Sequence, residues 1–488
     1  MTTEAQNTPK ITIDGQSYEF TPGQTIMQVM EKYNISNETP RYCYHPGLSI
    51  AGTCRMCQVE VEKAPKLMTS CSTPAGDGMV VHTQSEKVQK SRAGVMESLL
   101  ANHPLDCPVC DQAGECSLQD YNFAYGPNTS HMREEKRVYK NKTTYKLSDE
   151  LTLNMNRCIH CERCVRFTED VTKTNELIMV GRGWKKQIIT AGAHGLTNDY
   201  QGCIAEICPV GAFTFNDFRF KKRVWFLKKK ETICDGCSRG CNITAHVEKN
   251  KVYRYKARFN QDVNTHWMCD EGRKSFHTYE TRVENVLKQE NGEFSIQTWR
   301  NALEFAITKF AGAASVNVVI GTDASTEEAK LLMDEFSQIS KGQISFFYAN
   351  EVNAIKTSQD DKDIDSLLKR QDKTANTKGL ESLGLKPFEN QTADILFHAR
   401  FGRSAVLASE AKFKIAFGVF SQNELKNYDL YLPGPTTLEK EGSFTNCQNI
   451  TQTFKAAIKA PEQIATLTEV IAAIKELQSA TTQRDIHV

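Results

Sequence analysis

Cys158-Ile159-His160-Cys161-Glu162-Arg163-Cys164 is the stretch that decides how this chain is organised, together with Cys208-Pro209 further on. Cysteines spaced three apart usually direct their thiolates to one metal centre. The chain has 488 residues and 17 cysteines, and all of them except Cys447 lie between Cys43 and Cys269, in tight pairs and triplets. A secreted disulfide framework would spread its cysteines. The pattern therefore indicates a reduced, intracellular metalloprotein.

The spacing of this central set resembles half of a two-cluster ferredoxin. There the run C-x2-C-x2-C-x3-C-P occurs twice, and the fourth cysteine of each run serves the other cluster. Here Thr168 replaces the fourth cysteine of the first run, and the second run keeps only Cys208 of its four positions. We therefore expect one complete [4Fe–4S] set and the loss of its twin. The set is Cys158, Cys161, Cys164 and Cys208. Cys203 is out of register and is expected to be a packed or surface thiol.

Upstream lies a second set with the pattern H-x3-C-x2-C-x5-C, which is His103, Cys107, Cys110 and Cys116. Residues 88–102 before it have helical periodicity, with Ser91 as a possible N-cap. A Cys₃His zinc site competes with an iron–sulfur cluster at this set. In a cluster, imidazole in place of one thiolate would raise the reduction potential.

The first set in the chain has the pattern C-x10-C-x2-C-x13-C and comprises Cys43, Cys54, Cys57 and Cys71. Residues 10–20 before it predict two short strands around an Asp-Gly turn, and residues 58–62 alternate like a strand. The small residues Ala51-Gly52-Thr53 let backbone amides approach cluster sulfurs. Four thiolates on such a loop suit a [2Fe–2S] cluster, with a zinc site as the alternative.

The last set has the pattern C-x2-C-x3-C-x27-C and comprises Cys234, Cys237, Cys241 and Cys269. Residues 242–256 predict a hairpin that turns at 248–251 and returns Cys269 to the other three cysteines. A third [4Fe–4S] cluster or a zinc ribbon fits this pattern. The four sets together use His103 and every cysteine except Cys203 and Cys447, so no set lacks a ligand.

Charge, hydropathy and motifs exclude several other functions. A net charge of +1 gives no support for nucleic-acid binding, and no apolar run is long enough for a membrane-spanning helix. Residues 1–10 show neither a secretory signal nor a transit peptide. No G-x-G-x-x-G, P-loop or nucleophile elbow is present, and Gly181-Arg182-Gly183 is expected to be a turn. The chain should therefore move electrons and transform no organic substrate, so no catalytic residue is assigned.

Two groups of basic residues have two interpretations each. The runs 221–223 and 228–230 flank an expected strand at 224–227 and form either a solvated face or a docking face for an acidic partner. Arg55, Arg163 and Arg166 lie beside cysteine ligands. They either offset the charge of reduced clusters or are ordinary surface residues.

Several motifs closely resemble the large iron–sulfur subunit of respiratory complex I, NADH:quinone oxidoreductase. They are Arg41–Pro46, Ala51–Cys57, His103–Asp111, Gly114–Asp120, Arg157–Cys161 and Cys208–Ala212. The fourth cysteine set is similar to the additional [4Fe–4S] site of some bacterial members. The resemblance is specific over residues 10–275 and is weaker beyond them.

The resemblance implies an α+β multidomain fold with five parts. These are a β-grasp [2Fe–2S] ferredoxin domain at 1–88, a helical His-Cys₃ domain at 89–148, a ferredoxin-like [4Fe–4S] domain at 149–228, a small β domain with the additional [4Fe–4S] cluster at 229–290, and a shortened α/β domain of molybdopterin-oxidoreductase type at 291–488. The chain would hold one [2Fe–2S] cluster and three [4Fe–4S] clusters, and no molybdopterin, flavin or NAD.

The C-terminal half resembles the α/β domain of molybdopterin oxidoreductases. The similarity lies in Trp299–Leu303, a strand at 315–322, Leu432–Thr436 and Glu439–Asn446, and it fails at Cys447-Gln448-Asn449. A helix is predicted at 329–339, with Ser325 and Glu328 at capping-box spacing. Residues 360–378 are polar and predict a loop or flexible excursion. We expect this half to be a structural remnant without a cofactor.

The function implied by the resemblance is electron relay. Electrons would arrive from the flavin-containing NADH-oxidising subunit and leave through a two-[4Fe–4S] ferredoxin-like subunit toward the quinone. Further partners would be the thioredoxin-like [2Fe–2S] subunit and the quinone-site subunits, on the cytoplasmic face of a bacterial inner membrane. The alternatives are the diaphorase-arm subunit of an NAD-linked hydrogenase, an iron–sulfur subunit of a formate dehydrogenase, and a zinc-stabilised structural protein.

Overall fold

The computed structural model describes residues 8–140, 143–192, 194–407 and 409–485. Residues 1–7, for which the sequence predicts no leader, lie outside this description. Internal contacts divide the chain into two compact units, Met1–Phe226 and Leu227–Val488. Among the described residues, no helix has both the length and the hydropathy needed to span a bilayer.

The first unit begins with a five-stranded sheet in the order β2-β1-β5-β3-β4. Its strands are β1 (Lys10–Ile13), β2 (Gln16–Glu19), β3 (Gln58–Val61), β4 (Met68–Thr69) and β5 (Val80–His82). The helix α1 (Ile26–Lys32) starts with a capping box and packs its apolar side on this sheet, where it meets Ile11, Val59 and Val81. The predicted hairpin at 10–20 and strand at 58–62 are confirmed.

Two helices follow the sheet in this unit, α2 (Glu86–Leu100) and α3 (Ser117–Tyr125). The predicted helix at 88–102 is confirmed, but Ser91 is not its N-cap. The helix begins two residues earlier than expected, and the Ser85 hydroxyl accepts the N–H of Val88 at 3.4 Å. Ser91 lies within the helix and hydrogen-bonds the side chain of Gln58 instead.

The rest of the first unit consists of short elements around the central cysteine set. A three-stranded sheet has the order β10-β7-β6, and β8 and β9 form a separate hairpin. The bounds are β6 (Tyr145–Lys146), β7 (Leu151–Leu153), β8 (Leu177–Val180), β9 (Gln187–Thr190), β10 (Phe213–Phe215), α4 (Arg163–Arg166) and α5 (Gln201–Ile207). A π-helical turn, Phe167–Val171, continues α4. The expected strand at 224–227 is wrong, because Val224–Phe226 forms a 3₁₀ turn and only Lys228 onward is extended.

The second unit opens with a three-stranded antiparallel sheet of β11 (Lys228–Ile233), β12 (Asn242–Glu248) and β13 (Lys251–Ala257). The turn between β12 and β13 is Lys249-Asn250, whose two residues both have positive φ. The predicted hairpin is therefore confirmed. The one-turn helix α6 (Asp270–Arg273) follows directly after Cys269.

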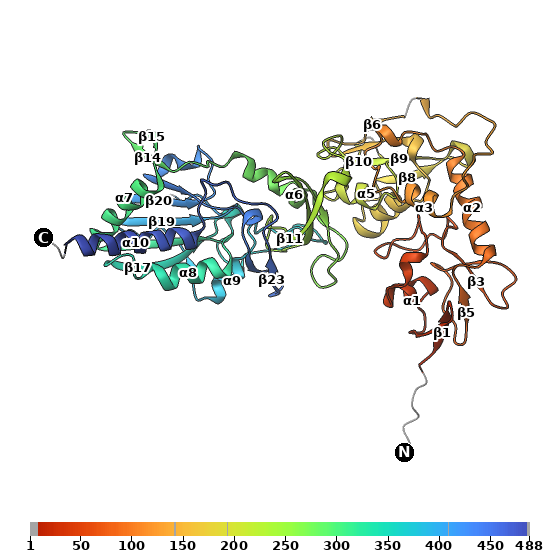
Figure 1. The fold of residues 1–488 in the computed structure, drawn as a ribbon, viewed down its shortest axis with the longest axis horizontal. Helices are drawn as coiled ribbons and strands as arrows, with labels where there is room; N and C mark the ends of the chain where they lie inside the picture. The colour runs from red at the N-terminus through yellow and green to blue at the C-terminus, as the bar shows by residue number, and fades with distance from the viewer. Residues whose placement is uncertain (1–7, 141–142, 193, 408, 486–488) are drawn as a thin grey trace, which may run out of the picture. The chain divides into compact units, whose positions relative to one another are not determined.

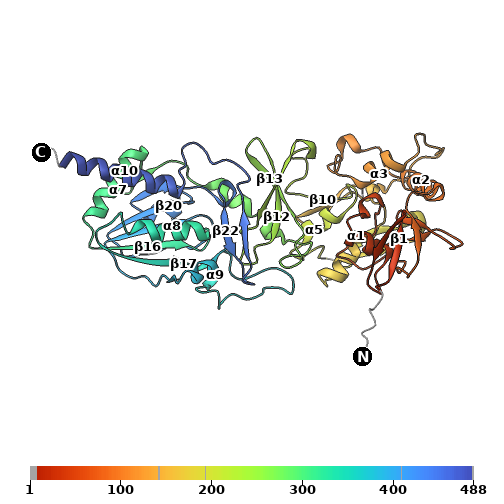
Figure 2. The same cartoon turned by 60° about the horizontal axis from the view of Figure 1, so that its bottom comes forward.

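An eight-stranded sheet forms the rest of the second unit, in the order β15-β14-β21-β20-β19-β16-β17-β18 (Figures 1 and 2). The six strands from β21 to β18 in this order are parallel, and β14 joins β21 antiparallel. The bounds are β14 (Leu287–Glu290), β15 (Glu293–Ile296), β16 (Ser315–Gly321), β17 (Gln343–Ala349), β18 (Lys386–Pro387), β19 (Ile395–Arg400), β20 (Phe413–Gly418) and β21 (Leu430–Pro433).

Helices cover one face of this sheet. They are α7 (Trp299–Ala311), α8 (Thr326–Phe336), α9 (Thr377–Ser382) and α10 (Leu467–Asp485), and they share one core with Val316, Val318 and Ile320 of β16. Segments without regular structure cover the other face, through Leu407 and Ala411. The predicted strand at 315–322 is confirmed, and so are the helix at 329–339 and its capping box, although the helix begins and ends three residues earlier. A hairpin of β22 (Gly442–Thr445) and β23 (Thr451–Phe454) completes the unit.

Candidate metal centres

The structure brings the four cysteines of the first set together. Cys43, Cys57 and Cys71 are buried and Cys54 is half-buried. The N–H of Cys43 donates to the Cys54 sulfur at 3.5 Å. Hydrogen bonds from Cys54 and Cys71 lower the pKa of Cys43, and one from Cys71 lowers the pKa of Cys57 to about 7. Four thiols close enough to share protons can share iron atoms after deprotonation.

The second set lies between the end of α2 and the start of α3. Cys110 and Cys116 are buried, Cys107 is exposed, and His103 and Cys116 line a cavity of about 630 Å³. The Nδ1 atom of His103 is buried without a hydrogen-bond partner. Burial, with the nearby charge of Arg157, lowers the pKa of His103 to about 4. The imidazole is therefore neutral near neutral pH, as a metal ligand must be.

The segment after Cys208 closes the second set from another side. A Cβ atom placed on Gly211 would lie 2.2 Å from the sulfur of Cys110, so this glycine leaves room for the thiolate. Arg223 donates to the carbonyl oxygen of Cys110 at 2.6 Å. Part of the basic run 221–223 is thus engaged here and does not belong to a solvated face. Gly211 lies within the quoted stretch Cys208–Ala212, but sequence reasoning did not assign it this role.

The third set in chain order is the central set, and its four cysteines line one small cavity beside α4 and β10, namely Cys158, Cys161, Cys164 and Cys208. Burial raises the pKa of Cys158, Cys161 and Cys164, and that of Cys208 to about 12. Thr168, at the position of the missing twin's ligand, is buried and donates to the Val165 carbonyl oxygen at 2.9 Å. Cys203 is fully buried on α5, which confirms that it is packed.

The fourth set joins the loop between β11 and β12 to the start of α6. All four cysteines are buried, and the hairpin of β12 and β13 returns Cys269 to the others as predicted. Two glycines leave room for the sulfurs. Gly236 donates its N–H to Cys234 at 3.4 Å, and Gly272 donates its N–H to Cys269 at 3.3 Å. A Cβ on Gly272 would approach both of these sulfurs within 3.3 Å.

The donor sets fit iron–sulfur clusters chemically. Burial is the main factor that raises the pKa of every thiol in the third and fourth sets, so thiolates there need a cation to offset their charge. Within the ranges that the structure describes, no three His, Cys, Asp or Glu side chains are grouped as a site for a single metal ion.

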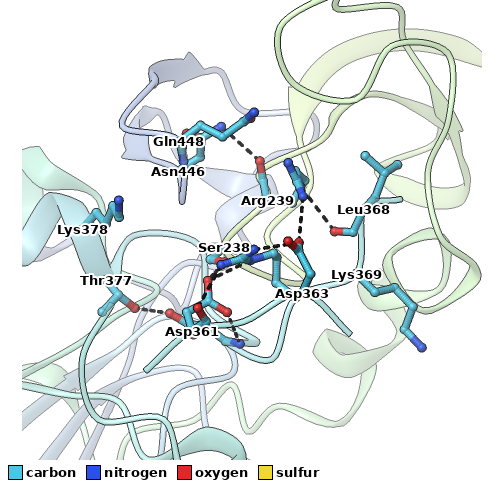
Figure 3. A network of polar contacts seen from close by, with 12 residues as sticks. Ser238, Arg239, Asp361, Asp363, Leu368, Lys369, Thr377, Lys378, Asn446 and Gln448 are labelled. Atoms are coloured by element: carbon cyan, nitrogen blue, oxygen red, sulfur yellow. Dashed lines mark hydrogen bonds and ion pairs between the residues drawn. The ribbon is translucent and has the colours of Figure 1, made fainter. Parts of the chain in front are cut away.

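A polar network fixes the loop between Cys237 and Cys241 to the segment 361–377 (Figure 3). Ser238 donates its N–H to the Asp372 carbonyl oxygen at 3.0 Å and its hydroxyl to Asp361. Arg239 pairs with Asp363 at 3.1 Å. The predicted loop at 360–378 is therefore an ordered cover on this cysteine loop rather than a flexible excursion, and α9 begins within it at Thr377. No local sequence signal indicates these long-range contacts.

The three arginines beside ligands differ in their surroundings. Arg55 is exposed. Arg166 is buried, and Arg163 is half-buried with its Nε atom out of reach of solvent. Arg163 and Arg166 are therefore not ordinary surface residues, whereas Arg55 is one.

Four family models match the chain, and each spans one ligand set. A 2Fe-2S iron-sulfur cluster binding domain matches residues 6–86, and an NADH-ubiquinone oxidoreductase-G iron-sulfur binding region matches 92–131. The ferredoxin-like domain of NADH-quinone oxidoreductase subunit 3 matches 148–214, and a molybdopterin oxidoreductase Fe4S4 domain matches 227–279. The chain thus carries domains of [2Fe–2S]-binding and [4Fe–4S]-binding types.

Curated relatives agree with these domains. The chain is 37% identical to the NADH-ubiquinone oxidoreductase 75 kDa subunit of Reclinomonas americana, over 74% of this chain and 52% of that protein. It is 39% identical to an NADH-quinone oxidoreductase subunit of Rickettsia bellii, over 67% of this chain and 48% of that protein. The chain therefore spans about half the length of the curated relatives it matches.

A solved NAD⁺-reducing [NiFe]-hydrogenase in the H₂-reduced state matches 44% of this chain and 91% of the compared chain, at 29% identity and a TM-score of 0.38. This score is too low to bear on the fold. The sequence identities and the four domain matches agree with each other. Over the residues they cover, the chain is a homologue of the 75–78 kDa NADH-ubiquinone oxidoreductase subunits and their bacterial NADH-quinone oxidoreductase counterparts.

Proposed function

We propose that this chain is the electron-relaying iron–sulfur subunit of an NADH:quinone oxidoreductase. The observation that carries the proposal is that, in each of four cysteine-rich sets, the members lie near one another within one iron–sulfur domain match. Iron–sulfur clusters accept and release single electrons, and the protein sets their spacing, burial and potential. The chain itself would bind, position and shield them.

The proposed ligands follow the four sets that the sequence spacing predicts. One [2Fe–2S] cluster would be held by Cys43, Cys54, Cys57 and Cys71. Three [4Fe–4S] clusters would be held by His103 with Cys107, Cys110 and Cys116, by Cys158, Cys161, Cys164 and Cys208, and by Cys234, Cys237, Cys241 and Cys269. We assign no molybdopterin, flavin or NAD to this chain, and we keep the five-domain division at 88, 148, 228 and 290.

Contacts between ligand loops support a relay within the first unit. Arg166 donates to carbonyl oxygens of Cys43 in the first set and Cys161 in the third. The sulfur of Cys116 in the second set lies 3.8 Å from the carbonyl oxygen of Pro209, directly after a ligand of the third. Electron transfer between centres depends on such proximity, so these three sets are the proposed path. The fourth set lies in the other unit, and its place on the path is left open.

Exposed apolar side chains support docking of a partner beside the second set. Leu105 is 87% exposed and Phe123 is 85% exposed, and both line the cavity next to His103. Large apolar side chains that lie together on the exposed surface are typical of a protein–protein interface. We propose four kinds of partner for this chain. They are the two-[4Fe–4S] ferredoxin-like subunit, the flavin-containing NADH-oxidising subunit, the thioredoxin-like [2Fe–2S] subunit and the quinone-site subunits. The proposed assembly lies on the cytoplasmic face of a bacterial membrane.

The proposal is tested by metal content, spectroscopy and co-purification. Anaerobically reconstituted chain should bind about 14 iron atoms with matching acid-labile sulfide. After reduction, electron paramagnetic resonance should show one [2Fe–2S] and three [4Fe–4S] signals. The native assembly should contain an NADH-oxidising flavoprotein. A preparation that holds zinc and almost no sulfide would contradict the cluster assignment, and hydrogen or formate oxidation by the isolated chain would contradict the relay.

A further inference from the structure

Two guanidinium groups join the ligand loops of the first and third sets. Arg166 donates through Nη2 to the carbonyl oxygens of Cys43, at 2.5 Å, and Cys161, at 3.3 Å, and through Nη1 to that of Ser49. Arg163 donates through Nη2 to the carbonyl oxygen of Tyr44 at 2.6 Å and through Nη1 to that of Ile207 at 2.9 Å. Each arginine thus contacts both the first ligand loop and the surroundings of the third set.

Neither guanidinium has an anionic partner among the described residues. All their hydrogen bonds go to neutral carbonyl oxygens, and the buried Nε atom of each has no partner. An unpaired charge out of water is strongly unfavourable, so a compensating negative charge should lie nearby.

Other arginines that lie within two positions of a proposed ligand in the chain are neutralised or solvated. Arg157, next to Cys158, is buried and pairs with Asp106 at 2.9 Å. Arg239, between Cys237 and Cys241, pairs with Asp363 at 3.1 Å. Arg55, next to Cys54, is exposed, where water screens its charge. Uncompensated positive charge is therefore a property of Arg163 and Arg166 in this comparison.

We propose that Arg163 and Arg166 are positioning residues that clamp the first and third ligand loops together and set the reduction potentials of the two clusters held there. The inference rests on the proposed function, because four-thiolate clusters are the anions that would compensate the two arginines. A cluster gains negative charge on reduction, so a fixed cation nearby favours its reduced form and raises its potential. The hydrogen bonds of each guanidinium group keep its charge between the first and third ligand loops, because each arginine contacts both sides.

The test uses the full reconstituted chain and redox titration followed by electron paramagnetic resonance. Arg166→Gln and Arg163→Gln remove the charge, while Arg166→Lys and Arg163→Lys keep it without the fork. At the wild-type midpoint of the first and third clusters, each glutamine variant should lower the ratio of reduced to oxidised cluster about tenfold, which is about 59 mV for a one-electron couple. The lysine variants should stay within about twofold, and Arg55→Gln is the control beside a ligand.

Iron and sulfide analysis separates the possible failures. If wild-type chain assembles no clusters, the proposed function fails. If the variants assemble them and the ratios stay within about twofold of wild type, only this inference is overturned. If the glutamine variants lose clusters that the lysine variants keep, the charge is supported as the requirement. Loss of the clusters in lysine and glutamine variants alike would show that hydrogen bonding alone matters, and would overturn the role of charge.

Discussion

At the scale of single residues, burial alone does not distinguish the proposed ligands from other thiols. Cys203 is fully buried on α5 and lies outside the four sets, whereas Cys107, in the second set, is exposed. What the proposed ligands share is a position in a group of four, and several of them have a glycine or a main-chain N–H group beside the sulfur. Grouping is therefore the property that a substitution should test.

We predict that Cys161→Ser removes one four-iron cluster and that Cys203→Ala removes none. Serine oxygen is a poorer ligand for iron–sulfur clusters than thiolate, so the iron content should fall from about 14 to about 10 atoms per chain. The measurement is iron and sulfide analysis of reconstituted chain. Equal iron content in the two variants would contradict the grouping of the third set.

His398, in the middle of β19, should make the stability of the chain depend on pH. Burial, with the nearby charge of Arg400, lowers the pKa of His398 to about 3, and its Nδ1 lies 2.7 Å from the Tyr428 hydroxyl. The unfolded chain takes up a proton below about pH 6.5 that the folded chain does not, so stability rises with pH between about 3 and 6.5. When the pH falls from about 7 to about 5, this residue should lower the free energy of unfolding by about 2 kcal/mol.

The measurement is the denaturant midpoint of wild type and His398→Gln at about pH 5 and about pH 7. The variant should lose stability more slowly than wild type as the pH falls. The difference between the two proteins removes the effect of acid on cysteines and clusters, which both proteins share. Parallel pH profiles would show that this histidine is not the group responsible.

At the scale of elements, local sequence signals predict the fold well where the stabilising contacts are local. The Asp14-Gly15 hairpin, the β12–β13 hairpin and the Ser325–Glu328 capping box depend on residues a few positions apart, and all three form. The prediction of Ser91 as the N-cap is wrong because Ser85 also precedes the helical pattern and caps the helix instead. The strand expected at 224–227 was wrong because apolar content alone does not separate a strand from a short helical turn.

Long-range contacts could not be predicted from the sequence. The spacing of the cysteines predicted which residues gather, because three members of each set lie close in the chain. It could not show that Gly211 leaves room for Cys110, that Arg166 joins two ligand loops, or that Asp361 lies against Ser238. These contacts join residues about 100 positions apart, and no periodic pattern records them.

The cover over the fourth set yields a prediction at this scale. Asp361 is 2% exposed and binds Arg370 and Ser238, whereas Asp363, two positions later, is 57% exposed. Asp361→Asn should leave Arg370 partly unpaired and loosen the cover, at a cost of about 3 kcal/mol, while Asp363→Asn should cost below about 1 kcal/mol. A chelator should therefore remove the iron of one four-iron cluster faster in Asp361→Asn than in wild type, and no faster in Asp363→Asn. The loss of cluster absorbance measures the rate. Similar rates in both variants would show that the network does not shield the set.

At the scale of the whole molecule, the chain consists of two compact units with separate cores and separate ligand sets. Residues up to Phe226 contain the first three sets, and residues from Leu227 contain the fourth together with the eight-stranded sheet. No proposed ligand set draws members from both units. Cluster assembly should therefore be divisible between them.

We predict that residues 1–226 and 227–488, produced separately, bind about 10 and about 4 iron atoms. Iron analysis and electron paramagnetic resonance of each piece check the numbers. A matched cut within the second unit, after residue 290, should abolish binding in 227–290, because the segment 361–377 that covers the fourth set is then missing. Iron bound equally by 227–290 and 227–488 would show that the cover is dispensable.

One edge of the large sheet ends in β18, which has only the two residues Lys386 and Pro387. Proline has no N–H to donate, and lysine carries a charge that a neighbouring apolar strand would not accommodate. β18 itself is therefore a poor template for the backbone of a second molecule, and it disfavours fibrous self-association where it borders the sheet.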